Sequence, residues 1–164
     1  MLVISDTTAI TNLAAINQLS LLHALYGQIV IPEAVEHELV IPGVSNPGAS
    51  EVQSQSWIIT QAVLDHSLVT RLLAEHEALD IGEAEAIALT VELKADLLLI
   101  DDGVGRRIAK ERGLVITDLL GSLLEAKERS IISAVRPVLD DLITVAGFYV
   151  APSLYSYICQ LANE

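Results

Sequence analysis

The chain has 164 residues and a net charge of −13, with nine Lys and Arg against 22 Asp and Glu. This length predicts one domain, residues 1–164, which can bury a core without a disulfide or a structural metal. So few cations argue against a protein that holds nucleic acid mainly through its phosphates. The chain is 52% hydrophobic but only 4% aromatic, a balance typical of parallel strands covered by helices on both faces.

The chain carries no signal for a membrane or for export. No segment approaches the roughly 20 apolar residues that a membrane span needs. The apolar stretch 2–4 lacks the basic region of a signal peptide, and the single Cys159 has no partner for a disulfide or a thiolate metal site. We therefore expect a cytoplasmic protein that does not bind membranes.

Short apolar runs alternate with longer segments of helical periodicity. Four runs predict strands, at residues 2–5, 28–31, 95–100 and 114–117. Two more strands are expected at 57–63 and, as an edge strand, at 148–150. Helices are expected at 10–16 and 21–25 (one helix or two), 32–40, 68–79, 83–94, 104–112, 119–129, 131–145 and 152–162, with a loop at 42–50. This alternation predicts parallel βαβ units in an α/β domain.

Aspartates follow three of the predicted strands. Asp6 ends the first, Asp101 and Asp102 follow the run at 95–100, and Asp118 follows the run at 114–117. The carboxyl ends of parallel strands meet at one edge of a sheet, so these acids are expected to converge there. The alternative at each position is a helix N-cap, and Asp118, directly before a Leu-rich helix, fits that role best.

Two glutamate positions extend the acidic set. On the helix that begins near Pro32, Glu38 falls on the apolar arc, where a buried carboxylate needs a partner such as a cation. On the helix at 83–94, Glu83 and Glu85 lie on opposite polar stripes, and spacing does not separate them. We choose Glu83, in the first turn where the helix dipole favours a carboxylate, and keep Glu85 as the alternative.

Several segments together resemble those of PIN domains, in particular an uncharacterised prokaryotic branch of predicted nucleic-acid-binding proteins. They are residues 5–10 (SDTTAI), 31–35 (IPEAV), 38–39 (EL), 82–89 (GEAEAIAL), 99–102 (LIDD) and 105–109 (GRRIA). The resemblance implies a Rossmann-like, three-layer α/β/α fold with a central parallel sheet of about four to five strands. It also implies Mg²⁺ or Mn²⁺ as cofactor and single-stranded RNA as substrate. Many relatives are toxins with an antitoxin protein as partner, and many are homodimers.

Carried over by position, the resemblance implies a site of four acids: Asp6, Glu38, Glu83 and Asp101. The chain departs from the common toxin pattern in two places. Leu99 or Ile100 stands where that pattern has Thr or Ser, and the acid at the helix start is Glu rather than Asp. Asp102 therefore stays open as an alternative to Asp101.

The site hypothesis is a metal-dependent endoribonuclease. Carboxylate oxygens are the hard ligands that Mg²⁺ prefers, and the bound metal would activate a nucleophile and stabilise the leaving oxygen. Asp6 and Asp101 are the expected direct ligands, while Glu38 and Glu83 would complete the shell or orient water. Arg106 lies on a solvated helix face, forms a local ion pair with Asp102, or contacts a substrate phosphate. The alternative function is a catalytically weak or inactive module that binds protein or nucleic acid, which the low basic content supports.

Overall fold

A single sheet of five parallel strands forms the centre of the computed structural model, which describes residues 1–164. The strands lie in the order β3-β2-β1-β4-β5, and every neighbouring pair is parallel. Their bounds are β1 Val3–Ser5, β2 Ile29–Pro32, β3 Ile58–Gln61, β4 Leu97–Leu99 and β5 Ile116–Thr117. The predicted α/β class with a parallel sheet is confirmed.

Alternate strand residues face opposite sides of this sheet, as the two-residue period of a strand requires. In β1, Val3 belongs to one apolar cluster and Ile4 to the other. In β4, Leu98 and Leu99 divide in the same way. Each cluster is covered by helices, so the molecule has three layers, α/β/α.

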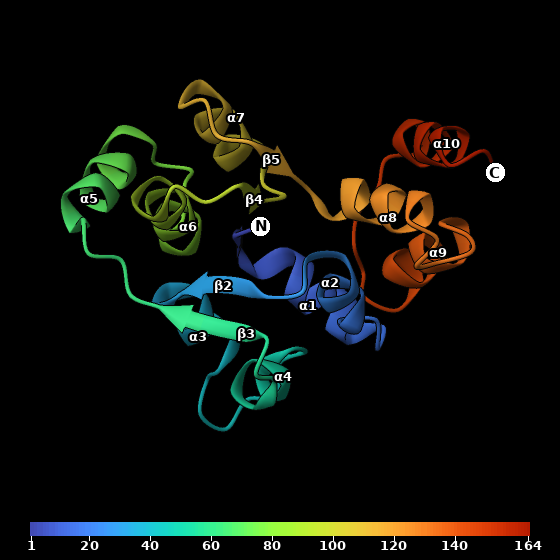
Figure 1. Cartoon of the computed structure of the whole chain (residues 1–164), viewed down its shortest axis with the longest axis horizontal. Helices are drawn as coiled ribbons and strands as arrows, with labels where there is room; N and C mark the ends of the chain where they lie inside the picture. Colours follow the sequence, from blue (N-terminus) through green and yellow to red (C-terminus); the bar gives the residue numbers. More distant parts are fainter.

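Ten helices supply the two outer layers (Figure 1). The larger apolar cluster takes buried residues from α1 Thr7–Ala15, α2 Ser20–Tyr26, α3 Glu33–Leu39, α4 Ala49–Ser54, α8 Leu119–Glu128, α9 Arg136–Thr144 and α10 Pro152–Leu161. The smaller cluster takes them from α5 His66–Glu75, α6 Ile81–Leu93 and α7 Gly103–Glu111. In Figure 1, α8, α9 and α10 gather at one end of the molecule, with the C-terminus. None of the helices has the length and apolar character needed to cross a bilayer.

The predicted edge strand at 148–150 is wrong. These residues form neither helix nor strand, and they follow Gly147, whose φ of 73° turns the chain out of α9. Phe148 donates its backbone N–H to Leu142 of that helix at 2.9 Å and packs on the larger apolar cluster. The packing of Phe148 and Val150 on this cluster, not a strand ladder, accounts for the apolar character of this segment.

The predicted helix at 131–145 begins later than expected. Its helical part is α9, which starts at Arg136, and residues 131–135 are irregular. Pro137 lies in the first turn of α9, where its missing N–H costs nothing, so it favours a helix that begins close to this position. The preceding turn is fixed by Ser130, whose φ is 59°.

Two smaller differences lie near β2 and β3. Pro32 was expected in the first turn of a helix but is the last residue of β2 and the N-cap of α3. The loop expected at 42–50 gives way at Ala49 to the short helix α4, which the sequence reading missed. Val52 is its one buried residue, so the helix has almost no apolar periodicity to detect.

Candidate functional site

The neighbouring strands β1 and β4 bring two of the expected acids together. Ser5 pairs with Leu99 in the parallel ladder, so both strands end at the same edge of the sheet. Beyond the ladder, Asp6 donates its backbone N–H to the Leu99 carbonyl at 3.0 Å. The backbone N–H of Asp101 in turn donates to Asp6 Oδ2 at 3.2 Å. We call this edge, with Asp6, Glu38, Glu83 and Asp101, the acidic rim.

Asp6 is almost completely buried, with 3% of its surface exposed. It is the N-cap of α1, and its Oδ1 accepts a hydrogen bond from Thr8 N at 3.2 Å. Burial raises the pKa of Asp6 well above its usual value, and the negative charge of Asp101 raises it further. No Lys or Arg forms an ion pair with this carboxylate.

Asp101 has one carboxylate oxygen bound and one free. Its Oδ1 accepts from the backbone N–H of Leu119 at 3.1 Å, whereas its Oδ2 is buried without any hydrogen-bond partner. Burial raises the pKa of Asp101 to about 6, with the charge of Asp118 adding to the rise. A buried carboxylate oxygen without a partner costs free energy, and a bound cation would remove that cost.

Glu83 reaches the acidic rim from the start of α6. It forms a capping box with Asp80: Glu83 N donates to Asp80 Oδ1 at 2.8 Å, and Asp80 N donates to Glu83 Oε2 at 3.1 Å. Burial raises the pKa of Glu83 to about 7, and the charges of Asp80, Asp102 and Glu38 add to the rise. Asp80 was not singled out from the sequence, although an Asp three residues before a Glu at a helix start is a capping-box signal.

Glu85, the alternative to Glu83, points elsewhere. Its Oε2 accepts the backbone N–H of Ala34 at 2.9 Å, which satisfies one of the free donors at the start of α3. Glu92, on the same stripe of α6, likewise binds the backbone N–H groups of Leu64 and Asp65. Glu85 and Glu92 thus bind backbone donors of neighbouring segments, whereas Glu83 lies close enough to Asp6 for its charge to raise the pKa of Asp6.

The expectation that Glu38 is directed into a packed face is wrong. Its side chain is exposed, because the seven-residue α3 buries only Val35 and Leu39 and leaves Glu38 at its edge. Its carboxylate still turns toward the acidic rim, where Oε2 accepts a hydrogen bond from Thr7 Oγ1 at 2.7 Å. A Cβ at Gly82 would lie 3.5 Å from the same oxygen, so Glu38 closely approaches the start of α6. Thr7 is a site residue that the sequence reading missed.

Asp102 and Asp118 act as helix caps. Asp102 Oδ2 accepts from the backbone N–H groups of Val104 and Gly105, at 2.7 and 2.9 Å, at the start of α7. Asp118 Oδ1 accepts from Gly121 N at 2.7 Å at the start of α8. Arg106 pairs with Asp118 at 2.7 Å and not with Asp102 as considered from the sequence. Of the two neighbouring aspartates, only Asp101 has a buried carboxylate oxygen without a partner.

The acids of the rim lie close to one another but do not form a complete set of metal ligands. The charges of Asp101 and Glu83 raise the pKa of Asp6, and the charge of Glu38 raises the pKa of Glu83, which requires short separations. No three His, Cys, Asp or Glu side chains are arranged so that they could hold a metal ion as they stand. Mg²⁺ does not require such a cage, because it usually binds one or two carboxylates and keeps several waters. The Asp6–Asp101 pair, with its free oxygen, fits that coordination.

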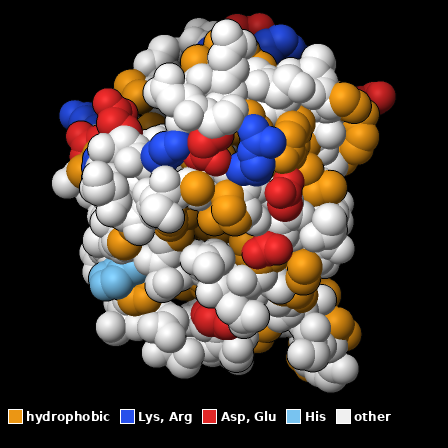
Figure 2. Space-filling view, turned by 90° about the vertical axis from the view of Figure 1, so that its right-hand side faces the viewer, with side chains coloured by type: hydrophobic (Ala, Val, Ile, Leu, Met, Phe, Trp, Pro, Cys, Tyr) orange, Lys and Arg blue, Asp and Glu red, His pale blue; other side chains and the backbone are white.

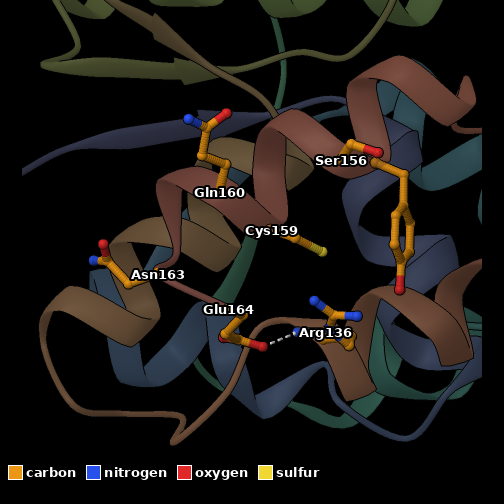
Figure 3. Close-up of a pocket in the computed structure, with 7 residues that line it drawn as sticks. Arg136, Ser156, Cys159, Gln160, Asn163 and Glu164 are labelled. Carbon is orange, nitrogen blue, oxygen red and sulfur yellow. Dashed lines mark hydrogen bonds between the residues drawn. The ribbon is translucent and has the colours of Figure 1, made fainter.

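Two cavities differ in their relation to this rim. One, of about 530 Å³, lies beside it between α3 and the start of α6, and Glu38 and Asp80 line it. The other, of about 460 Å³, lies between α9 and α10 (Figure 3). Arg136, Cys159 and Glu164 line this second cavity, and none of the rim acids does. On the face shown in Figure 2, Lys and Arg lie among Asp and Glu and form no broad basic patch.

Comparisons with known proteins give one family and one solved structure to which the chain is similar. A family model described as a PIN domain matches residues 2–164. Among solved structures, the chain is similar to a PilT N-terminus domain protein from the hyperthermophilic archaeon Sulfolobus solfataricus P2. That similarity has 17% sequence identity and a TM-score of 0.49, and it covers 92% of this chain and 98% of the other. No curated protein matches the chain in sequence.

Proposed function

Because the chain belongs to the PIN-domain family, whose members are generally metal-dependent nucleases, we propose that it is a Mg²⁺- or Mn²⁺-dependent endoribonuclease. The proposed reaction is hydrolysis of phosphodiester bonds in single-stranded RNA. The observation that carries the proposal is the buried, unpartnered Oδ2 of Asp101, which lies beside the buried Asp6. Two adjacent carboxylates with no Lys or Arg partner form a pair that a divalent cation would stabilise.

Asp6 and Asp101 would hold the ion. When bound, it would activate water as the nucleophile and stabilise negative charge on the leaving oxygen. The protein keeps both carboxylates in place through backbone hydrogen bonds, from Thr8 and Asp101 to Asp6 and from Leu119 to Asp101. These bonds fix the two side chains before any ligand arrives, so little ordering cost remains for binding.

Glu83 is the residue best suited to accept a proton. Its pKa of about 7 in the free protein places it near the pH at which a general base works best. The capping box with Asp80 holds the Glu83 carboxylate at the start of α6, because Asp80 N donates to Glu83 Oε2. Glu38, oriented by Thr7, would hold water or a second ligand on the opposite side.

The remaining parts of the proposal concern the cellular role. With only nine Lys and Arg, the chain would rely on the bound cation rather than on a basic surface to hold the RNA phosphate. We further propose a cytoplasmic homodimer that acts as the toxin of a toxin–antitoxin pair. Its antitoxin partner would then provide basic groups that complement the net charge of −13.

Metal-dependent cleavage by an Asp6→Asn variant tests the proposal. Asn is an equally good N-cap, so α1 should keep its start while the site loses one charge. Asp65→Asn is the matched control: Asp65 caps α5 through Leu68 N in the same way and lies outside the rim. We expect Mn²⁺-dependent cleavage of single-stranded RNA by the wild type and Asp65→Asn, and none by Asp6→Asn. Equal cleavage by all three proteins would refute the assignment.

A second candidate function is a binding module without catalysis. It is favoured by one observation, that no three side chains already form a metal-holding group. Calorimetric titration of the wild type with Mn²⁺ separates the two functions, because a module without a cation site should show no saturable binding. Saturable binding that Asp6→Asn removes would support the nuclease.

A further inference from the structure

We infer that Arg106 is a positioning residue that fixes the Asp101 carboxylate for its cation. This inference rests on the proposed function and extends it, because Arg106 itself touches neither Asp101 nor Asp6 through a hydrogen bond. It acts on the two backbone segments from which Asp101 is held. These are the end of β4, before Asp101, and the start of α8, which supplies a donor to Asp101.

One nitrogen of Arg106 joins the two segments. Its Nη1 donates to the carbonyl oxygen of Ile100 at 3.2 Å and pairs with Asp118 Oδ2 at 2.7 Å. Ile100 directly precedes Asp101, and Asp118 directly precedes Leu119, whose N–H donates to Asp101 Oδ1. Arg106 thus closes a ring of contacts that includes the bond holding Asp101. The backbone also joins these segments, because Ile100 N donates to the Thr117 carbonyl at 3.0 Å. Opening the ring would leave that ladder but remove the side-chain link closest to Asp101 and Leu119.

The location of the ion pair makes it more effective than a surface pair. The side chains of Arg106 and Asp118 are only 26% and 30% exposed. Asp118 also has its other oxygen bound, at 2.7 Å, by Gly121 N at the start of α8. The pair is therefore anchored at both ends, to α7 by the backbone of Arg106 and to α8 by the cap. Such anchoring restricts the motion of both segments, which an exposed pair does not do.

A direct contact to substrate phosphate is the competing role for Arg106. Both partners of Arg106 within the protein are bound by Nη1, so a phosphate contact would have to use Nη2 or Nε. A phosphate contact and a positioning role differ in what they affect. Loss of a phosphate contact weakens RNA binding and leaves cation binding intact, whereas loss of positioning weakens cation binding first.

The sign of the effect on cation affinity separates positioning from simple electrostatics. Removing a positive charge near a cation site should strengthen cation binding if charge alone matters. If Arg106 positions Asp101, its removal should instead weaken binding, by about 10- to 100-fold, as is usual for groups that orient metal ligands. The two explanations therefore predict opposite changes for one substitution.

The experiment measures Mn²⁺ affinity by calorimetry on metal-free wild type, Arg106→Gln and Arg107→Gln. Arg107 is the matched control, because it carries the same charge one residue away and pairs only with Glu111, both being more than half exposed. A double variant, Arg106→Gln with Asp118→Asn, keeps the net charge and the cap of α8 but cannot form the ring. It also avoids an unpaired half-buried carboxylate, should the single variant fail to fold.

We expect Arg106→Gln and the double variant to bind Mn²⁺ about 10- to 100-fold more weakly than wild type, and Arg107→Gln to bind it as wild type does. The KM for RNA at saturating Mn²⁺ should stay the same in all variants. Unchanged or tighter Mn²⁺ binding by both Arg106 variants would overturn the inference while leaving the proposed function intact. A raised KM with unchanged Mn²⁺ affinity would overturn it in favour of a phosphate contact. No Mn²⁺ binding by the wild type would overturn the proposed function and this inference with it.

Discussion

The acidic rim and the Glu164 carboxylate of the C-terminal segment show two opposite ways of placing carboxylates in this fold. At the rim, the buried Asp6 lies beside Asp101, whose Oδ2 is buried without a partner, and the pKa values of both are raised. At the other end, Glu164 pairs with Lys127 at 2.6 Å and accepts the backbone N–H groups of Val135 and Arg136. Its pKa is lowered to about 2, mainly by the hydrogen bond from Lys127.

The difference lies in which groups compensate the negative charge. The charge of Glu164 is compensated within the protein, by Lys127 and by two backbone N–H groups. Through these contacts Glu164, which we call the latch, joins α8 and the start of α9 to the C-terminal segment. Asp6, Glu83 and Asp101 accept backbone N–H groups, no rim acid forms an ion pair with Lys or Arg, and Asp101 Oδ2 has no hydrogen-bond partner. Carboxylates that stabilise a fold are paired internally, while those kept for a ligand remain uncompensated until it binds.

The largest expected effect is on cation binding. Asp101→Asn should weaken Mn²⁺ binding by more than about 100-fold, since a direct ligand counts for more than a group that only orients one. Glu164→Gln should leave Mn²⁺ affinity at the wild-type value. Calorimetric titration of both variants with Mn²⁺ measures this difference. A similar loss of Mn²⁺ affinity in the two variants would show that the acidic rim is no more important for cation binding than Glu164.

The second effect is on how the free energy of unfolding depends on pH. The pKa of Asp101 is raised to about 6 and that of Glu83 to about 7, so the folded protein binds more protons than the unfolded chain between about pH 4 and 7. The contribution of these groups is fully present below their unfolded pKa values and is lost as pH rises through the folded ones. We expect the metal-free protein to lose roughly 1–3 kcal/mol of unfolding free energy between pH 5 and 8.

Urea unfolding with and without Mn²⁺ measures this loss. Added Mn²⁺ should restore stability at pH 8 and have little effect at pH 5, where protons compete for the same oxygens. For Glu164 the sign is reversed: its lowered pKa gives stability above the unfolded value, which is lost as pH falls from about 4.5 to about 2. If the unfolding free energy of the metal-free protein rises steadily from pH 5 to 8, the pKa values of Asp101 and Glu83 are not raised in the folded state.

A third effect distinguishes the two glutamates of α6. Glu83→Gln keeps the capping box, because Gln also serves at that position, but it removes the proton acceptor. We expect it to lower the cleavage rate by about 100-fold or more. Glu85→Gln keeps an acceptor for Ala34 N and should leave the rate unchanged, with less than about 1 kcal/mol of stability lost. The rates of RNA cleavage by the two variants test this assignment. Equal rates for Glu83→Gln and Glu85→Gln would show that Glu83 does not accept a proton in the reaction.

The smallest effect concerns the latch itself. Glu164→Gln should lower the melting temperature slightly and flatten the loss of stability below pH 4.5, because Gln cannot form the charge-assisted bond to Lys127. Calorimetric melting at pH 3 and pH 7 measures both changes. An equal loss at the two pH values would show that the charge of Glu164 does not contribute.

The sequence predicted most of the elements, because nearly all of them carry a strong periodic signal. The prediction of elements from the sequence was wrong where one or two apolar residues pack on the core without a repeating apolar pattern. Phe148 packs as one aromatic ring and not within a strand, and α4 buries only Val52. Pro137 could have shortened the expected helix at 131–145, since a proline favours the first turn of a helix.

The amino-acid sequence by itself determined the α/β class and the convergence of the strand-end acids, because strand and helix alternate and an Asp follows three strands. Which of those acids stay free was decided only by the tertiary structure. Asp102 and Asp118 became helix caps, Glu85 turned to α3, and Glu38 came to the surface beside Thr7. The physical reason is that each carboxylate binds whichever backbone donors or cations lie within reach, and those partners come from segments far apart in the chain.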